Sequence, residues 1–332
     1  YVRLRVSEAE RRQAKHDIQH VEDIVIEMLR NARDAGADKV YLATTKEDGV
    51  RTLVFLDNGS GVPQDMQERI FDARVTSKLE SMKMDRWGVH GRGMALFSIK
   101  QNTDEARVVA SDVDLGSVFK VSVDTDRLGE RADQSSWPQA VKDEDGRYVC
   151  ARGPHNIIRA ACEFALEELR ACDVYLGSPS EIAATLHAQA SSRLDASRLL
   201  FIDDEAELPV VDRLGLASDA EDFIRICSGL GLEMSERTAH RILAGQIKPV
   251  RGVTARLLRE RDSSSHASAP VDLAKDRRGL RIAKDDMAQF SRAVERDFND
   301  LASRYYLNLC GDPKIRVSRD RITVTFDLAK EE

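Results

Sequence analysis

The chain has 332 residues, of which 42% are hydrophobic and 32% charged, with a net charge of −7. This length suits two or three domains with hydrophobic cores, and the acidic balance argues against a protein that coats nucleic acid. No apolar run approaches about 18 residues, and the five cysteines lack zinc-site spacing, so we expect a cytoplasmic protein with reduced thiols and no membrane segment.

The first strongly patterned segment is a helix predicted over about residues 17–35. Glu27, Asn31 and Asp34 are spaced i, i+4 and i+7, which places them on nearly the same helical face. Apolar residues surround them, so the helix is expected to be buried. A buried acid and amide are costly unless they have partners or a function. Arg33 is expected to be solvated.

Two strands are predicted next, KVYLATTK and RTLVFLD, joined by a turn that contains Asp48 and Gly49. The second strand ends at Asp57, and Gly59 and Gly61 follow. An acid at a strand end followed by Gly-x-Gly allows the backbone to approach a ligand closely. The same residues also fit a plain Asn-Gly turn, so this motif alone leaves both interpretations open.

A glycine-rich sequence at residues 88–93 directly precedes the helical run MALFSIK. The free N–H groups of such a loop and the dipole of the helix that it opens both favour a bound anion. Two strand-like runs follow, EARVVASD and SVFKVSVD, with Gly116-Ser117 at the start of the second. We therefore expect a phosphate site ahead of this helix.

Taken in order, these motifs resemble the GHKL superfamily of ATPases, which includes gyrase, the ninety-kilodalton heat-shock chaperone, histidine kinases and MutL. The resemblance covers about residues 5–125. Thr76-Ser77-Lys78 is similar to the MutL lid, and residues 88–91 are similar to the corresponding gyrase loop. It implies an α+β fold: a two-layer Bergerat-type ATP-binding sandwich with a mixed, mainly antiparallel sheet and helices on one face. From their own residue patterns, the residues that follow are expected to form a mostly helical C-terminal region.

The resemblance also implies ATP and Mg²⁺ as ligands. Glu27 would be the general base that activates water, Asn31 would coordinate Mg²⁺, and Asp57 would accept a hydrogen bond from the adenine amino group. One helical turn, about 6 Å, separates Glu27 from Asn31 and suits a water between acid and phosphate. The other residues expected around the nucleotide are Asp34, Gly59, Gly61, Val62, Thr76, Ser77, Lys78, Gly88, His90, Gly91, Arg92, Gly93, Met94 and Ser117.

Several of these residues have a second interpretation. Asp34 is either a solvated acid or a support of the site through water. Lys78 either contacts the γ-phosphate or only belongs to a lid. His90 is expected to pack in the lid or cap the backbone rather than catalyse.

The expected domains are an ATP-binding domain over 1–126, a linker over 127–153, a mostly helical domain over 154–262, a linker over 263–279, and a helix with a strand hairpin over 280–332. Within the third, a helix-turn-helix is expected at about 228–252, with a plain helical hairpin as the alternative. This segment is locally basic because it holds Arg237, His240, Arg241, Lys248 and Arg251.

The expected function is Mg-dependent ATP binding and slow hydrolysis that drive a conformational switch or a nucleotide-dependent homodimer, with a DNA or protein client at the C-terminal region. One alternative is a protein kinase of the histidine-kinase or anti-sigma type, because His16 and His20 lie just upstream on a helix. Another is an ATP-sensing DNA-binding regulator without significant turnover.

Overall fold

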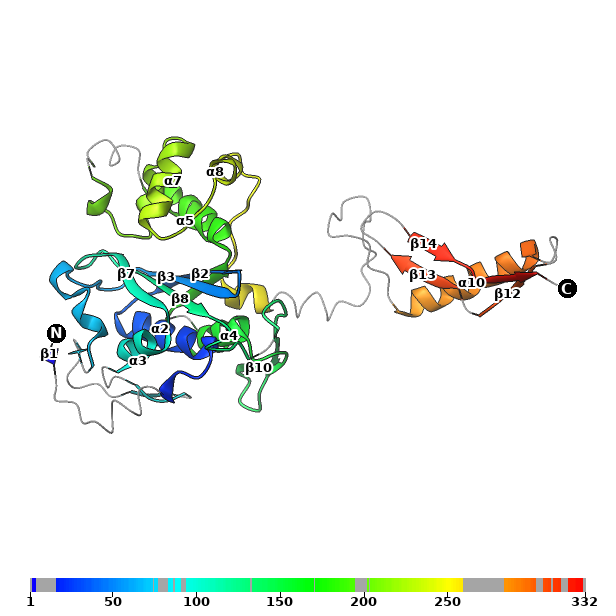
Figure 1. Ribbon diagram of the computed structural model, residues 1–332, viewed down its shortest axis with the longest axis horizontal. Coiled ribbons are helices and arrows are strands. Elements are labelled where there is room, and N and C mark those ends of the chain that lie inside the picture. Colours follow the sequence, from blue (N-terminus) through cyan, green and yellow to red (C-terminus); the bar gives the residue numbers. More distant parts are fainter. Residues whose placement is uncertain are drawn as a thin grey trace. The chain divides into compact units, whose positions relative to one another are not determined.

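The computed structural model describes residues 2–3, 16–73, 75–76, 83–85, 87–90, 94–131, 133–169, 171–194, 202, 204–258, 284–302, 307–311, 313–317 and 322–330. Backbone contacts divide the chain into two compact units, Tyr1–Ser265 and His266–Glu332. Each unit has its own helices and strands (Figure 1).

The first unit is built on a five-stranded sheet with the order β11-β2-β3-β8-β7. β11 runs parallel to β2, and the other neighbours in this sheet are antiparallel. The predicted mixed, mainly antiparallel sheet of an α+β fold is therefore confirmed. Its strands are β2 (Lys39–Glu47), β3 (Val50–Asp57), β7 (Glu105–Ser111), β8 (Ser117–Asp124) and β11 (Asp173–Gly177).

The β2–β3 hairpin closes through the predicted turn. Glu47 pairs with Val50, so Asp48 and Gly49 form a two-residue loop. Both have positive φ, 47° and 82°, as a type I′ turn requires. This turn sets the register of β3 and hence which face each of its side chains occupies.

Helices on one face of the sheet enclose the larger core. Side chains alternate along β3, so Leu53 and Phe55 face these helices, and Ile24 and Phe164 are among the helix residues packed there. In Figure 1 the three helices lie below the sheet. They are α2 (Val21–Asp34), α3 (Ala95–Asn102) and α4 (Ile157–Glu167).

The reverse face of the sheet is also covered. Val54 and Leu56 of β3 pack in a second core with Phe223 and Ala239. Figure 1 shows α5, α7 and α8 above the sheet. The helical elements of this layer are α5 (Pro179–Arg193), η3 (Glu205–Glu207), η4 (Arg213–Leu216), α7 (Ala220–Gly229) and α8 (Glu236–Leu243).

The compact units differ from the domain boundaries expected from the sequence. Residues 127–153, expected to be a linker, include the antiparallel pair β9 (Gln139–Lys142) and β10 (Tyr148–Arg152). α4 packs in the core with α2, and β11 joins the edge of the same sheet. The reason is hydrophobic burial: Val174 and Leu176 of β11 complete the core that the first 126 residues leave open.

The first unit also contains four short strands and two short helical turns outside the main sheet. β1 (Val2–Arg3) pairs with β4 (Val75–Thr76), and β5 (Lys83–Asp85) pairs with β6 (Gly88–His90). Two 3-10 turns lie between β3 and β4 in sequence, η1 (Gln64–Met66) and η2 (Arg69–Phe71).

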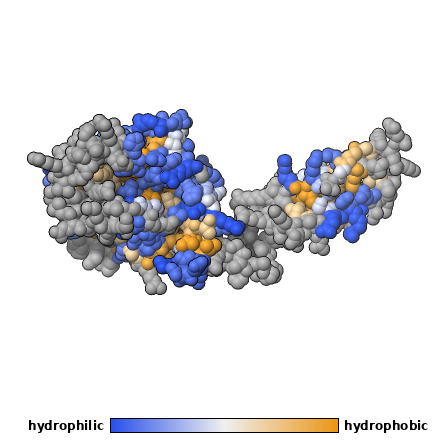
Figure 2. All heavy atoms as spheres, turned by 90° about the horizontal axis from the view of Figure 1, so that it is seen from below, coloured by the Kyte–Doolittle hydropathy of each residue, from blue (hydrophilic) through white to orange (hydrophobic). Residues whose placement is uncertain are grey.

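The second unit combines one helix with two strand pairs. The elements are α10 (Lys284–Ala302), β12 (Leu307–Leu309), β13 (Lys314–Val317), β14 (Ile322–Thr325) and β15 (Leu328–Lys330). β12 pairs with β15 and β13 with β14, both antiparallel. Phe298 and Phe326 stack with ring centroids 3.9 Å apart. Figure 2 shows hydrophobic and hydrophilic residues side by side on this unit's surface.

Across the described part of the chain, no helix has the length and apolar character to cross a membrane.

Candidate functional site

His20 caps the start of α2, and its backbone N–H donates to the Asp23 carboxylate at 2.9 Å. This contact satisfies a backbone donor at the start of the helix, and the acids Glu22 and Asp23 suit the positive end of the helix dipole. This cap starts α2 at Val21 rather than at about residue 17 as expected from the sequence, and Glu27 and Asn31 follow within the helix.

Glu27 is held by Arg30, one turn further along α2. Arg30 Nη1 donates to Glu27 Oε1 at 2.7 Å, while Nε and Nη2 donate to the two carboxylate oxygens of Asp85, both at 2.9 Å. The Arg30 side chain is only 3% exposed, and that of Asp85 7%. A buried guanidinium bound in this way has little freedom. It therefore fixes the Glu27 side chain relative to β5.

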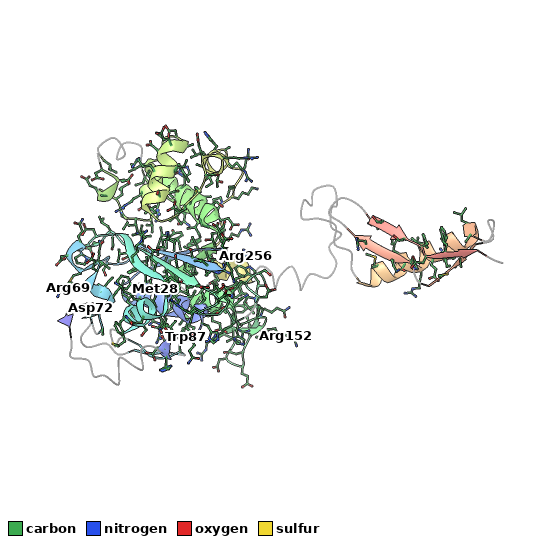
Figure 3. The ribbon with its side chains drawn as sticks, viewed as in Figure 1. Met28, Arg69, Asp72, Trp87, Arg152 and Arg256 are labelled. Atoms are coloured by element: carbon green, nitrogen blue, oxygen red, sulfur yellow. The ribbon has the colours of Figure 1, made fainter. Side chains whose placement is uncertain are left out.

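Asp85 also joins β5 to α4. Its carboxylate accepts the Trp87 N–H at 3.0 Å, and the Trp87 ring stacks on Phe164 with centroids 6.3 Å apart. Figure 3 labels Trp87 on the side of the sheet where Met28 of α2 lies. The β5–β6 hairpin is thus attached to two of the helices that cover this face.

Arg33 is part of the same network, which corrects the expectation that it is solvated. Its side chain is 12% exposed and contacts Asp34 at 3.1 Å, Asp85 at 3.3 Å and Glu168 at 3.0 Å. Burial alone lowers the pKa of the Arg33 guanidinium, but the contacts with Glu168 and Asp34 outweigh burial and the pKa is raised. Asp34, expected near the nucleotide, is therefore bound to a cation of its own helix.

Asn31 has a polar atom without a partner. Its Nδ2 is buried and makes no hydrogen bond to any described residue. The two ends of an amide are interchangeable by rotation, so Oδ1 can take the same position. An amide oxygen is a suitable Mg²⁺ ligand, and Mg²⁺ usually takes its other ligands from water and phosphate. The described residues hold no group of three His, Cys, Asp or Glu side chains arranged for a metal. An amide oxygen of Asn31, together with phosphate oxygens and water, would fit a Mg²⁺ ion.

Asp57 and Ser117 face the same helices from the sheet. They are register partners on β3 and β8, and both are buried, with 4% and 3% exposure. Burial raises the pKa of Asp57 to about 7, although the Gly59 N–H, which donates to Oδ1 at 2.8 Å, lowers it. Asp57 is thus a buried acceptor whose ionisation falls near neutral pH.

The Ser117 hydroxyl lies 3.2 Å from the Ser111 hydroxyl. Ser111 in turn accepts the Val62 N–H at 2.7 Å and donates to the Gly116 carbonyl at 2.8 Å. This network connects the loop after β3 to the turn before β8. These hydrogen bonds within the protein are sufficient to hold Val62 and Ser117 in position, so their positions alone do not indicate a ligand.

The glycines after Asp57 are explained by contacts within the protein. Gly61 has φ 69°, and a Cβ there would lie 1.8 Å from the Asp112 carbonyl oxygen. A Cβ at Gly59 would lie 2.9 Å from the Ala35 carbonyl oxygen, to which Ser60 N–H donates. The loop therefore touches the end of α2, next to Asp34. These contacts favour the turn interpretation of both glycines and leave their contact with a base as a proposal.

The expected lid and phosphate loop are described only in part. Thr76 ends β4, and the backbones of Gly88 and His90 form β6. Met94 directly precedes α3, and its carbonyl accepts the Ser98 N–H at 2.8 Å. Ser77, Lys78, Gly91, Arg92 and Gly93 lie outside the described residues.

Sequence reasoning missed Arg30, Asp85 and Glu168. The available signal was a basic residue, Arg30, on a helix otherwise buried by its apolar residues, because such a cation requires a carboxylate partner. The partner is 55 residues away, in a segment without a motif.

The fold is consistent with an ATP-binding sandwich of the GHKL type: it has a mixed sheet, an acid at the end of β3 and the helix α2 over that face. The comparison with known families agrees: residues 18–130 match the family described as "Histidine kinase-, DNA gyrase B-, and HSP90-like ATPase". The expected resemblance of this region to the GHKL superfamily is therefore confirmed.

Curated relatives support the MutL side. The chain is 33% identical over 98 residues to "DNA mismatch repair protein MutL" of Thermodesulfovibrio yellowstonii, which covers 28% of this chain and 18% of that protein. Proteins of the same name match from Pediococcus pentosaceus (33% over 90 residues, 26% of this chain and 14% of that protein) and Staphylococcus aureus (34% over 113 residues, 31% and 17%). The chain thus spans less than a fifth of the length of these relatives, all within one region.

Proposed function

We propose that this chain binds Mg²⁺ and ATP between α2 and the sheet and hydrolyses ATP slowly. The observation that carries the proposal is the buried Nδ2 atom of Asn31, which has no hydrogen-bond partner and lies one turn after Glu27 on the helix that covers the face of Asp57. A buried polar group without a partner is costly, and a ligand that supplies the partner removes this cost.

In the proposed reaction, Glu27 takes a proton from water as the water oxygen attacks the γ-phosphorus. The bond from that phosphorus to the β,γ-bridging oxygen breaks, and ADP leaves with the electron pair. Mg²⁺ supplies charge neutralisation on the phosphates when bound. Arg30 orients the Glu27 carboxylate through its 2.7 Å contact. Asp57 accepts a hydrogen bond from the adenine amino group, and Ser117 lies beside Asp57 on the neighbouring strand.

The proposed outcome of nucleotide binding is a conformational or dimerisation switch that acts on a DNA or protein client. The similarity to MutL supports this form of the proposal. Dimerisation is tested by light scattering with a non-hydrolysable ATP analogue, Mg²⁺ and the full chain. If the measured mass stays that of a monomer at saturating analogue, nucleotide-dependent dimerisation is contradicted. The proposal of a conformational switch within one chain would then still stand.

The proposed hydrolysis is tested by phosphate release from wild type, Glu27→Ala and Glu47→Ala, each with and without duplex DNA. Glu47 is an exposed acid at the end of β2 and is the matched control. Loss of a general base lowers the rate by about 10²–10⁴-fold. Glu27→Ala should show this loss and still bind ATP, while Glu47→Ala should match wild type. Equal turnover in all three proteins contradicts the role of Glu27.

The kinase alternative is less favoured by the position of His20. This residue begins α2, where its backbone contact with Asp23 has a structural purpose. His16 is exposed. Incubation with γ-labelled ATP separates the two functions, because label retained on the protein indicates a kinase and label released as free phosphate indicates a hydrolase. An ATP-sensing regulator would bind nucleotide and do neither.

A further inference from the structure

α8 is rigidly held on the reverse face of the sheet. Ala239 and Ile242 point into the second core, with 0% and 5% exposure. The chain after α8 is fixed as well, because the Val250 N–H donates to Thr185 Oγ1 of α5 at 2.9 Å. α8 therefore presents a fixed outer face on the side of the sheet opposite to the proposed nucleotide site.

The outer face of α8 carries three basic residues and one acid, Glu236, around a shallow, open hollow. Arg237, His240 and Arg241 are spaced i, i+3 and i+4, so they share one face, and all three are exposed. A hollow of about 570 Å³ lies at this face. We call it the α8 hollow, and its lining residues are Glu236, Arg237, His240, Arg241, Ala244 and Gln246.

The arginines of the α8 hollow do not serve the fold. Among the described residues, neither Arg237 nor Arg241 has an ion-pair partner within 4.0 Å. Neighbouring arginines differ: Arg225 of α7 contacts Glu205 at 2.6 Å, and Arg193 of α5 contacts Asp212 at 2.6 Å. Lys248 and Arg251, further along the chain, are also exposed. Two unpaired guanidinium groups on a fixed helix suit a phosphate, which each can bind through two N–H groups.

The dimensions and lining of this surface favour duplex DNA over a single strand. α8 is the second helix of a pair, and the turn before it contains Gly231 at φ 69°. An α-helix with its side chains is about 10–12 Å across, which fits the major groove of about 12 Å. Single-strand sites usually stack bases on aromatic side chains, and no Phe, Tyr or Trp is among the described residues lining the hollow.

We infer that the α8 hollow is a binding surface for duplex DNA, in which Arg237 and Arg241 contact phosphates. The overall charge of −7 does not oppose this, because phosphate contacts depend on the local patch. The inference does not depend on ATP hydrolysis, since the surface and the proposed nucleotide site lie on opposite faces of the sheet.

The test is fluorescence anisotropy of a labelled 20-base-pair duplex of arbitrary sequence, titrated without ATP with the full-length wild type or with the double variant Arg237→Ala/Arg241→Ala. The matched control is Arg147→Ala/Arg225→Ala, which removes the same charge from exposed arginines outside the hollow. A labelled single strand of equal length and unlabelled polyglutamate as competitor identify the occupant. Thermal unfolding is recorded for each protein.

Each lost phosphate contact reduces the slope of log affinity against log salt by about 0.9. The wild-type affinity should therefore fall about 12-fold further than that of Arg237→Ala/Arg241→Ala between about 50 and about 200 mM salt. The control should match wild type. Equal salt slopes in wild type and the Arg237→Ala/Arg241→Ala variant, a preference for the single strand, or stronger competition by polyglutamate than by unlabelled duplex would each overturn the inference. Because no nucleotide is present, failure here leaves the ATPase proposal standing, and failure of phosphate release leaves this inference standing.

Discussion

Asp57 and Ser117 lie directly opposite each other on β3 and β8, and both side chains face the layer of α2. Opposed residues of an antiparallel pair share one face of the sheet. Two buried polar groups therefore meet where a sheet of hydrophobic side chains would otherwise continue to the strand end. Both have partners within the protein, since Ser117 lies 3.2 Å from the Ser111 hydroxyl and Asp57 Oδ1 accepts the Gly59 N–H, which leaves the other Asp57 oxygen for the adenine proposed above.

The pKa of about 7 at Asp57 predicts a pH-dependent affinity for ATP. The Gly59 N–H already donates to Oδ1, so the other oxygen is left to accept a hydrogen bond from the adenine amino group. A proton on that oxygen makes it a donor and prevents this hydrogen bond. ATP affinity should thus be constant above pH about 7 and fall by up to about tenfold per pH unit below it. Fluorescent-nucleotide titrations between pH 5.5 and 8.5 measure this. Asp57→Asn should bind ATP more weakly and lose the pH dependence; a variant with the wild-type profile contradicts the role.

The same raised pKa has an opposite consequence for stability. Between the unfolded pKa of 3.8 and the folded value of about 7, the folded state holds the Asp57 proton and the unfolded state releases it. Folding stability should therefore decrease as pH rises through this window. Urea unfolding of wild type and Asp57→Asn at pH 5 and pH 7.5 gives the difference, and an Asn variant as pH-sensitive as wild type assigns the effect to other groups.

Removal of the Asn31 amide should separate metal-dependent from metal-independent binding. In wild type, Mg²⁺ is expected to raise ATP affinity, and EDTA should reverse this. In Asn31→Ala the Mg²⁺-dependent gain should be absent, because the proposed oxygen ligand is missing. Asn102, which donates to the Ser98 carbonyl on α3, provides an amide control as Asn102→Ala. A full Mg²⁺ response in Asn31→Ala would remove Asn31 from the metal site.

Asp85→Asn tests the buried network around Arg30. The variant leaves the Arg30 guanidinium short of a carboxylate in a buried position, which typically costs about 3–5 kcal/mol. Asp145→Asn is the control, since its pair with Arg147 is exposed and worth about 1 kcal/mol or less. Urea unfolding compares the two. Similar small losses in both would show that the Asp85 contact does not hold the β5–β6 hairpin.

Gly61→Ala should destabilise the protein more than Gly146→Ala. Both glycines have positive φ, 69° and 77°, so the conformational cost of about 1 kcal/mol is shared. Only Gly61 would bring a Cβ to 1.8 Å from a backbone oxygen, while Gly146 has open space. The difference in unfolding free energy isolates this close approach. Equal losses would mean that the loop near Asp112 relaxes to admit a side chain.

Local patterns in the sequence were sufficient for much of the ATP-binding half. The two strand-like runs that became β2 and β3 and the turn with Asp48 and Gly49 between them predicted the hairpin, and the apolar residues around Glu27 predicted α2. These features depend on residues close in sequence, for which backbone preference and side-chain direction are nearly independent of the rest of the fold. The motifs within them also carried the family assignment.

The tertiary structure decided the rest. β11 completes the sheet as a parallel edge strand, and α5, α7 and α8 cover its reverse face, although the local sequence of these segments does not show where they pack. The pairing of Arg30 with Asp85 joins residues 55 positions apart. Such contacts are chosen by the burial of apolar surface and by the need to pair buried charge, both of which depend on how distant segments meet. The sequence by itself determined a local ATP-binding pattern; the fold determined what holds Glu27 and which helix lies exposed on the other face.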